Sequence, residues 1–205
     1  SIILIIITAL CMLFVSGVPW KYILGLLGIS LIGCIILVSF KPYLMERVKT
    51  FVNPSQNSSG SSYQLQQSLI AIGSGGVFGR GLGQSIQKFN YLPEPQGDSI
   101  FAVLGEELGF IGTSAIILIY LAFALRGYKI AYRAPDSFSK LLVIGIITMI
   151  TAQSFMNIAS IIGVFPLTGV PLVFISHGGT ALLLSLGMMG IVLNISRQAS
   201  KTKPA

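Results

Sequence analysis

Most of the carboxylates of this sequence lie in one short stretch of an otherwise apolar chain. Four of its six acidic residues fall between positions 91 and 109, namely Glu94, Asp98, Glu106 and Glu107. An ionised carboxylate in hydrocarbon is costly, so the grouping predicts that these side chains face water or a polar substrate. A carboxylate in such a position can serve as a general base that accepts a proton from a hydroxyl nucleophile.

Two cations precede the carboxylates. Arg80 lies inside the segment GSGGVFGRGLGQS, residues 73–85, which contains six glycines, and Lys88 follows it. Arginine binds phosphate through its planar fork and lysine binds it as a point charge, so cations beside carboxylates at a membrane surface suit a lipid-phosphate substrate. A solvated loop with both side chains extended into water fits the spacing equally well.

The glycine-rich segment resembles a nucleotide-binding loop only superficially. A phosphate-binding GxGxxG loop needs a preceding strand and a following helix, and no strand pattern occurs here. Glycines that allow tight turns in a surface or re-entrant loop are the favoured interpretation. A backbone that closely approaches a ligand is the alternative.

Asp98 lies where the polar stretch gives way to an apolar segment, so it could also cap a helix. Pro95 argues against one helix that includes both Asp98 and Glu94, so no common face is predicted for them. Glu106 and Glu107 come about two helical turns after Asp98 and point roughly 80° and 180° away from it. We therefore predict that this pair forms buried polar contacts between helices, outside the immediate site of Asp98.

Ser176 and His177 are further candidates for substrate binding in a second outer segment. A single histidine without nearby carboxylates or cysteines is a weak metal ligand, and a hydrogen-bonded loop histidine is the favoured interpretation. Adjacent residues point apart, and no GxSxG motif surrounds this serine. Pro166, Gly169 and Pro171 predict a broken or re-entrant segment, which at membrane depth must be buried in protein or face a polar cavity.

Gln153 and Asn157 form a polar stripe on the apolar segment before that re-entrant stretch. The two amides are four residues apart and therefore share one face of a helix. They could line the cavity. Hydrogen bonding to another helix is the favoured alternative.

The composition is that of a polytopic membrane protein. Only 9% of the 205 residues are charged, and the mean hydropathy is +0.84, whereas soluble proteins average about 25% charged residues. The predicted fold is an all-α, polytopic transmembrane helical bundle in one domain, residues 1–205, with a large outer loop near 76–98 and re-entrant segments. We expect spans near 1–16, 22–40, 63–75, 99–125, 141–165 and 178–196.

Basic residues define the expected topology. The net charge of +7 is spread over the loops between spans and forms no patch with interleaved aromatics, so nucleic acid is not an expected partner. If the six spans alternate in direction, Lys41, Arg47 and Lys49 share one face with most other cations, and the positive-inside rule makes that face cytoplasmic. The loop 76–98 and the segment 165–180 are then outside. Cys11 and Cys34, without CxxC spacing, are expected to be buried thiols.

Several long motifs occur in an order that resembles a known family. They are an Asn-Pro pair at 53–54, YQLQQSLIAIGSGGVFGRGLGQS, QKFNYLPE, DSIFAVLGEELGFIG and FPLTGVPLVFISHGGT. Together they resemble the SEDS family of bacterial shape and division proteins, which comprises FtsW, RodA and SpoVE, and they resemble FtsW most. The resemblance covers essentially the whole chain, but the family has more spans. We therefore expect the C-terminal half of the family's length, beginning within a span.

The resemblance implies a peptidoglycan glycosyltransferase that acts during cell division. Its substrate would be lipid II, an undecaprenyl-diphosphate-linked disaccharide pentapeptide, polymerised into β-1,4 glycan at the outer face of the bacterial cytoplasmic (inner) membrane, at the septum. Asp98 matches the family's loop aspartate, whose implied role is the general base for the acceptor hydroxyl. Arg80 and Lys88 match basic positions that would bind the diphosphate, and Glu94 matches a loop glutamate. Gln96 and Gly97 replace a His-Thr pair common in the family, so the hydrogen bonding around Asp98 is expected to differ.

The resemblance also implies partners: a class B penicillin-binding protein, other divisome proteins and membrane lipids. No protein metal site or cofactor is expected, although a divalent cation, Mg²⁺ or Mn²⁺, could help to neutralise the leaving diphosphate. Two other functions stay open, a lipid II flippase or transporter and a divisome scaffold. The clustering of carboxylates in the outer loop favours chemistry over transport. Residues 1–205 in isolation are expected to be inactive.

Overall fold

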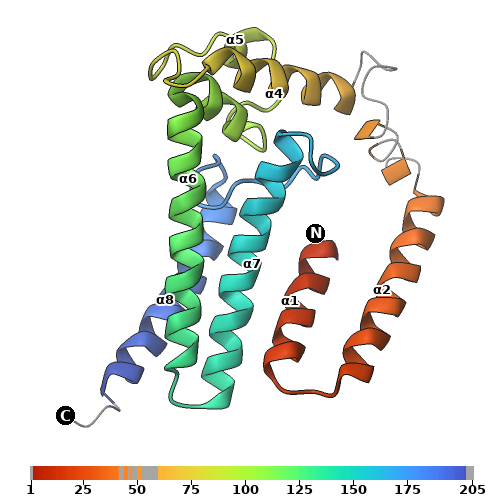
Figure 1. Cartoon of the computed structure of the whole chain (residues 1–205), viewed down its shortest axis with the longest axis vertical. Helices are drawn as coiled ribbons and strands as arrows, with labels where there is room; N and C mark the ends of the chain where they lie inside the picture. The colour runs from red at the N-terminus through yellow and green to blue at the C-terminus, as the bar shows by residue number, and fades with distance from the viewer. Residues whose placement is uncertain (1, 42–43, 46, 48–49, 52–59, 202–205) are drawn as a thin grey trace. The chain divides into compact units, whose positions relative to one another are not determined.

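The computed structural model describes residues 2–41, 44–45, 47, 50–51 and 60–201 (Figure 1). These residues form helices and no strand, which confirms the predicted all-α fold. The helices are α1 (Ile2–Val15), α2 (Trp20–Phe40), α4 (Ser61–Gly75), α5 (Gln87–Asn90), α6 (Ile100–Tyr132), α7 (Ser137–Ile161) and α8 (Gly179–Lys201). Lys49, the Asn53-Pro54 pair and Lys203, which entered the sequence interpretation, lie outside the described residues.

Four of the described helices are long and apolar enough to cross a membrane. They are α2, α6, α7 and α8, and α1 is a shorter apolar helix of 14 residues. The chain is therefore a multi-pass membrane protein. These helices correspond to the spans predicted near 22–40, 99–125, 141–165 and 178–196.

Packing divides the chain into two units. One consists of Ser1–Ile35, Tyr120–Ala152 and Gly179–Ala205, and the other of Ile36–Ile119 and Gln153–Gly178. Both α6 and α7 pass from one unit into the other. All the candidate site residues belong to the second unit.

In the first unit, α6 and α7 pack closely through small and hydroxyl-bearing residues. A Cβ placed on Gly127 would lie 2.5 Å from the side chain of Ile147. The hydroxyls of Tyr128 and Thr148 are 3.0 Å apart, and the Thr148 hydroxyl donates to the Cys11 sulfur of α1 at 3.4 Å. Close backbone approach and interhelical hydrogen bonds of this kind hold membrane helices together.

The N-terminus of α7 is capped by Asp136. Its carboxylate accepts hydrogen bonds from the backbone N–H of Ser139 at 2.8 Å and from the hydroxyl of the same residue at 2.7 Å. The backbone hydrogen bond, followed by the hydroxyl, holds the pKa of Asp136 below its usual value. The residue is fully exposed, so its role is that of an ordinary helix cap.

In the second unit, α6 is broken at Gly109. The residue has φ 65° and ψ −164°, a conformation that is essentially restricted to glycine. A break of this kind removes helical partners from the carbonyls before it and from the N–H groups after it. Such groups in a membrane protein need other partners.

The glycine-rich loop supplies those partners. Four backbone hydrogen bonds join loop and helix: Arg80 N to Glu106 O at 3.0 Å, Gly81 N to Glu107 O at 3.0 Å, Phe110 N to Gly76 O at 2.9 Å and Ile111 N to Val77 O at 3.2 Å. The approach is so close that a Cβ on Gly79 would lie 2.1 Å from the carbonyl oxygen of Glu107. Four glycines of the loop, at 76, 79, 81 and 83, have positive φ and allow tight turns, which is the interpretation that the sequence favoured.

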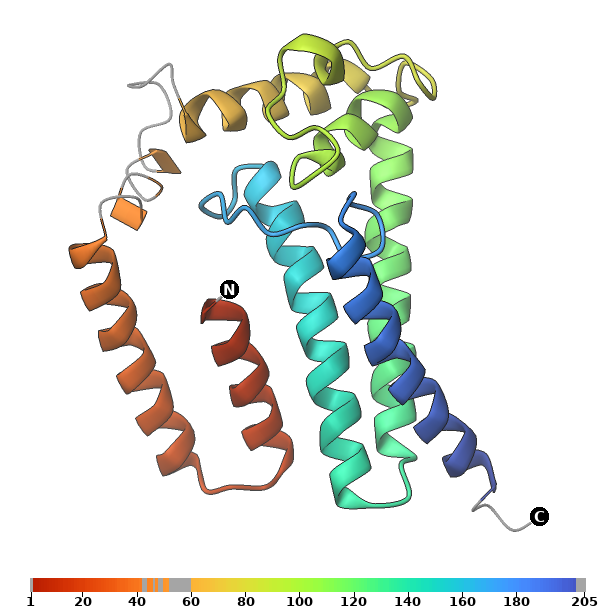
Figure 2. The same ribbon diagram turned by 180° about the vertical axis from the view of Figure 1, so that it is seen from behind.

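Helix α4 differs from the span expected near 63–75. It has 15 residues, whereas a span needs about 20. Figures 1 and 2 show α4 crossing the first turns of α6 instead of running beside them. The two backbones meet at glycines, since a Cβ on Gly75 would lie 2.0 Å from the carbonyl oxygen of Gly105.

This difference changes the topology of the preceding segment. The guanidinium of Arg47 donates through Nη1 to the carbonyl of Leu167, a residue of the predicted outer segment. Residues on opposite sides of a membrane cannot share a hydrogen bond, so the prediction that Arg47 is cytoplasmic is wrong. The error comes from α4. Counting α4 as a span assigned every segment before it to the opposite side of the membrane. Arg47 lies on the same side as the outer loop.

We predict that Gly109→Ala lowers the free energy of unfolding by about 2 kcal/mol or more, because a side chain at this φ and ψ is strained. The added Cβ would also lie 2.3 Å from the backbone nitrogen of Gly79. Gly190→Ala is the matched control, since a Cβ there meets nothing within 4 Å and alanine favours a helix by about 1 kcal/mol. Denaturant unfolding in detergent measures both variants. Equal stability would contradict the prediction.

Candidate active site

Asp98 lies in the turn that leads into α6 and is half-buried. One carboxylate oxygen, Oδ1, accepts a hydrogen bond from Gln64 Nε2 of α4 at 3.1 Å. The same amide donates to the hydroxyl of Ser99 at 2.9 Å. Helix α6 begins at Ile100, so Asp98 stands two residues before it. A side chain of α4 thus fixes the orientation of the candidate base.

Asn157 holds the same turn from α7. This residue is 1% exposed, and its Nδ2 donates to the backbone carbonyls of Asp98 at 2.7 Å and Val170 at 2.8 Å. Gln153, one turn earlier, donates to the carbonyl of Pro171 at 3.1 Å. The polar stripe predicted on this helix therefore binds backbone carbonyls of the irregular outer segment and of the base itself. The favoured alternative, bonding to another helix, is not what these contacts show.

The outer segment after α7 is irregular for a local reason. Gly163, with φ 76°, follows the helix, and the N–H of Val164 turns back to the carbonyl of Ala159 at 2.9 Å. A left-handed glycine directly after the last turn is a common helix terminator. Pro166 then prevents the helix from resuming. The chain is thereby free to run along the turn that carries the candidate base.

Ser176 and His177 tie this outer segment to the turn before α6. The Ser176 hydroxyl donates to the carbonyl of Gly97 at 2.7 Å and accepts from the N–H of Leu172 at 2.8 Å. The backbone N–H of His177 donates to the carbonyl of Gln96 at 2.8 Å, and its side chain is exposed. The structure thus joins both predicted residues to the backbone carbonyls just before Asp98. The serine hydroxyl acts in this contact as a structural link.

Glu94 shapes the turn in which Asp98 lies. Its φ is 47°, and its carbonyl accepts the N–H groups of Gly97 at 3.0 Å and Ser99 at 3.3 Å. Its side chain is exposed and folds over the turn, so that a Cβ on Gly97 would lie 3.2 Å from Glu94 Oε2. These contacts place Glu94 within the turn as its organising residue.

Arg47 belongs to the same cluster, and the sequence interpretation missed it. A Cβ placed on Gly169 would lie 3.3 Å from Arg47 Nη2 and 3.7 Å from Asp98 Oδ2. The guanidinium and the carboxylate therefore face the same bare glycine. The signal that could have found Arg47 was the polarity of α4, which carries three glutamines in YQLQQS and was a poor candidate for a span.

Arg80 and Lys88 lie elsewhere, paired with the two glutamates of α6. Lys88 Nζ is 2.6 Å from Glu107 Oε1, and Arg80 Nη1 is 3.6 Å from Glu106 Oε1. The structure does not show either cation beside Asp98. Their predicted role in holding a diphosphate therefore stays a prediction, and ion pairing is the role that the contacts display.

Glu106 anchors the loop that precedes α5. It is 1% exposed, and its carboxylate accepts the Ser85 hydroxyl at 2.6 Å, the Ile86 N–H at 3.1 Å and the Gln87 N–H at 3.2 Å. Buried carboxylates require such donors. The predicted structural role of the two glutamates is thus supported, although their partner is a loop and not another helix.

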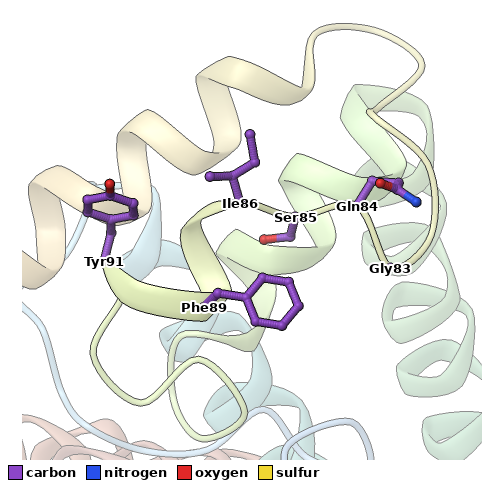
Figure 3. Close-up of a pocket in the computed structure, with 6 residues that line it drawn as sticks. All are labelled: Gly83, Gln84, Ser85, Ile86, Phe89 and Tyr91. Carbon is purple, nitrogen blue, oxygen red and sulfur yellow. The ribbon is translucent and has the colours of Figure 1, made fainter.

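A pocket of about 330 Å³ lies in the loop around α5 (Figure 3). Its lining residues all come from the stretch 83–91 and are Gly83, Gln84, Ser85, Ile86, Phe89 and Tyr91. Lys88 Nζ, next to this lining, is 5.2 Å from the ring centroid of Phe89. The pocket therefore adjoins the ion pair of Lys88.

The described residues bring together no group of three His, Cys, Asp or Glu side chains that could hold a metal ion. We therefore assign no residue to the divalent cation that the sequence left open.

The model of a family of cell cycle proteins, FtsW/RodA/SpoVE, matches residues 1–201. The chain belongs to this family. Stage V sporulation protein E of Bacillus subtilis (strain 168) is 47% identical over 192 residues, which cover 93% of this chain and 52% of the relative. The probable peptidoglycan glycosyltransferase FtsW of Geobacter sp. (strain M18) is 42% identical over 188 residues, 92% of this chain and 51% of the relative.

Solved structures of the FtsW/RodA/SpoVE type share the fold. One chain comes from a structure described as "Structural coordination of polymerization and crosslinking by a peptidoglycan synthase complex", with a TM-score of 0.74, 25% identity, and coverage of 96% of this chain and 55% of that one. RodA of Thermus thermophilus has a TM-score of 0.59, 24% identity, and coverage of 96% and 48%. This chain spans about half the length of the relatives it matches.

We predict that Glu106→Gln in this family member lowers the free energy of unfolding by about 1–3 kcal/mol, because an amide NH2 replaces an acceptor oxygen among three donors. The loop should open more often, so trypsin should cleave after Lys88 faster. Glu94→Gln, which changes an exposed carboxylate of the same stretch, is the control and should leave both quantities nearly unchanged. Indistinguishable cleavage rates in the two variants would argue against the anchoring role of Glu106.

Proposed function

We propose that this chain carries the general base of a peptidoglycan glycosyltransferase, and that the base is Asp98. The observation that carries the proposal is the half-buried Asp98 carboxylate, which Gln64 orients and which lies beside the Arg47 guanidinium. A carboxylate that is held in position can accept a proton from a hydroxyl within hydrogen-bond reach. The names of several relatives, probable peptidoglycan glycosyltransferase FtsW, support the reaction class.

The proposed substrate is lipid II, a disaccharide pentapeptide linked to undecaprenyl diphosphate. The acceptor sugar hydroxyl loses its proton to Asp98 as its oxygen attacks the anomeric carbon of the donor. A new carbon–oxygen bond forms, the bond to the diphosphate breaks, and the diphosphate leaves with the electron pair. One displacement inverts the anomeric centre, so an α-linked donor becomes a β-linked glycan. Positioned acid–base catalysis of this kind contributes about 10²–10⁴-fold in rate.

The proposal includes a location and partners. A multi-pass bundle with its site in an outer cluster suits polymerisation at the outer face of the bacterial cytoplasmic membrane, at the septum where the FtsW relatives suggest a division role. The solved complex that couples polymerization to crosslinking supports a class B penicillin-binding protein as partner. Other divisome proteins and membrane lipids complete the expected surroundings.

Asp98→Asn should reduce the rate of lipid II polymerisation by about 100-fold or more, because the amide cannot accept the proton. The assay uses the full-length protein co-purified with its class B partner and labelled lipid II. Asp136→Asn is the matched control, since it makes the same chemical change at a remote helix cap where asparagine caps as well as aspartate. The control should polymerise at the parent rate.

Polymerisation by Asp98→Asn at the parent rate would overturn the proposal. A flippase or scaffold function would then be favoured, and transport of lipid II by the same preparation would separate the two. Unchanged unfolding in detergent and unchanged binding of the partner show that loss of activity in Asp98→Asn reflects chemistry.

A further inference from the structure

The candidate base and the leaving group must both reach one reacting carbon. A hydrogen bond from the base to the acceptor oxygen, an attack distance of about 3–3.5 Å and a hydrogen bond from a cation to the leaving diphosphate limit the separation of base and cation to roughly 10 Å. A cation that neutralises the leaving group must therefore belong to the same cluster as Asp98. This argument rests on the proposed function.

Arg47 meets that distance requirement. Its Nη2 and the Asp98 Oδ2 lie 3.3 Å and 3.7 Å from the same point, the position of a Cβ on Gly169, so the two atoms are at most about 7 Å apart. The guanidinium is half-buried, and its Nη1 donates to the Leu167 carbonyl, which fixes its orientation. A fixed planar fork is suited to bidentate binding of phosphate oxygens.

The contacts of Arg80 and Lys88 place neither of them beside Asp98. Each is held by a glutamate of α6, Arg80 at 3.6 Å and Lys88 at 2.6 Å. These glutamates lie about two helical turns beyond the start of α6.

Gly169 lies against both Arg47 and Asp98. Its φ of 64° favours glycine, and any side chain would enter the space that the guanidinium and the carboxylate both face. Glycine is a common choice where a ligand must approach the backbone closely. The absence of a side chain on Gly169 therefore lets the guanidinium and the carboxylate share one side of its backbone.

We propose that Arg47 binds the diphosphate of the lipid-linked donor, directly beside Asp98 and Gly169. Arg80 and Lys88, in contrast, stabilise the loop through their ion pairs. The ligand class is a polyprenyl diphosphate, bound through its phosphate oxygens. The shared chemistry would also admit free inorganic diphosphate, which the experiment must separate from the lipid-linked form.

The test measures equilibrium binding of undecaprenyl diphosphate to the full-length protein in complex with its class B partner. Undecaprenyl diphosphate carries no sugar, so no turnover occurs in any variant. Arg47→Gln should weaken binding at least tenfold, and Arg47→Lys, which keeps the charge but loses the fork, should weaken it about threefold. Arg80→Gln and the exposed Arg133→Gln are the controls and should change binding less than twofold. Inorganic diphosphate should compete only at much higher concentration if the lipid contributes.

Unchanged binding in Arg47→Gln overturns the proposal, and so does an equal loss in Arg80→Gln. If Arg47→Gln fails to fold in detergent, Arg47→Lys decides, because parent-like binding in that variant contradicts a role for the fork. Equal affinity for inorganic diphosphate would contradict the lipid-linked assignment. Since binding is measured without turnover, its result is independent of whether Asp98→Asn abolishes polymerisation.

Discussion

The break in α6 at Gly109 is the constraint on which the outer part of this chain depends. Without it, the carbonyls of Glu106 and Glu107 would be satisfied inside the helix, and the glycine-rich loop would have nothing to bind. With it, helix and loop complete each other's backbone hydrogen bonds, and the side chains of the same two glutamates hold the next turns of the loop. The break at Gly109 therefore positions both the glycine-rich loop and the turns after it, which precede Asp98 in the chain.

The candidate base is held mainly by neutral groups. An amide of α4 binds its carboxylate, an amide of α7 binds its carbonyl, and a hydroxyl of the outer segment binds the residue before it. Neutral donors orient a carboxylate without the full electrostatic stabilisation that a paired cation gives. A guanidinium nearby can then serve a substrate as well as the protein. Neutral groups thus position the carboxylate, and the guanidinium supplies the positive charge of the site.

The sequence allowed the fold class and the four spans near 22–40, 99–125, 141–165 and 178–196 to be predicted, because apolar length is a strong local signal. It did not allow the placement of Arg47 to be predicted, since that depends on whether α4 crosses the membrane. Residues 63–75 are apolar enough to suggest a span, and only their glutamines and their length argue otherwise. Arg80 and Lys88 show a second limit of prediction from the sequence. Their types suit phosphate, but the partners that occupy them, Glu106 and Glu107, are set by a helix break that sequence spacing does not reveal.

The groups that meet at Asp98 come from distant parts of the chain, from Arg47 and Gln64 to Asn157 and Ser176. During synthesis the N-terminal members emerge first, and the last contact can form only once the segment before α8 has left the ribosome. Loop closure over such separations follows the local folding of the helices. The cluster is therefore completed late in biogenesis, when most of the described spans have already been made. A chain in which α7 has not yet been made holds the carboxylate and Gln64 but lacks Asn157 and Ser176, which hold the turn around Asp98.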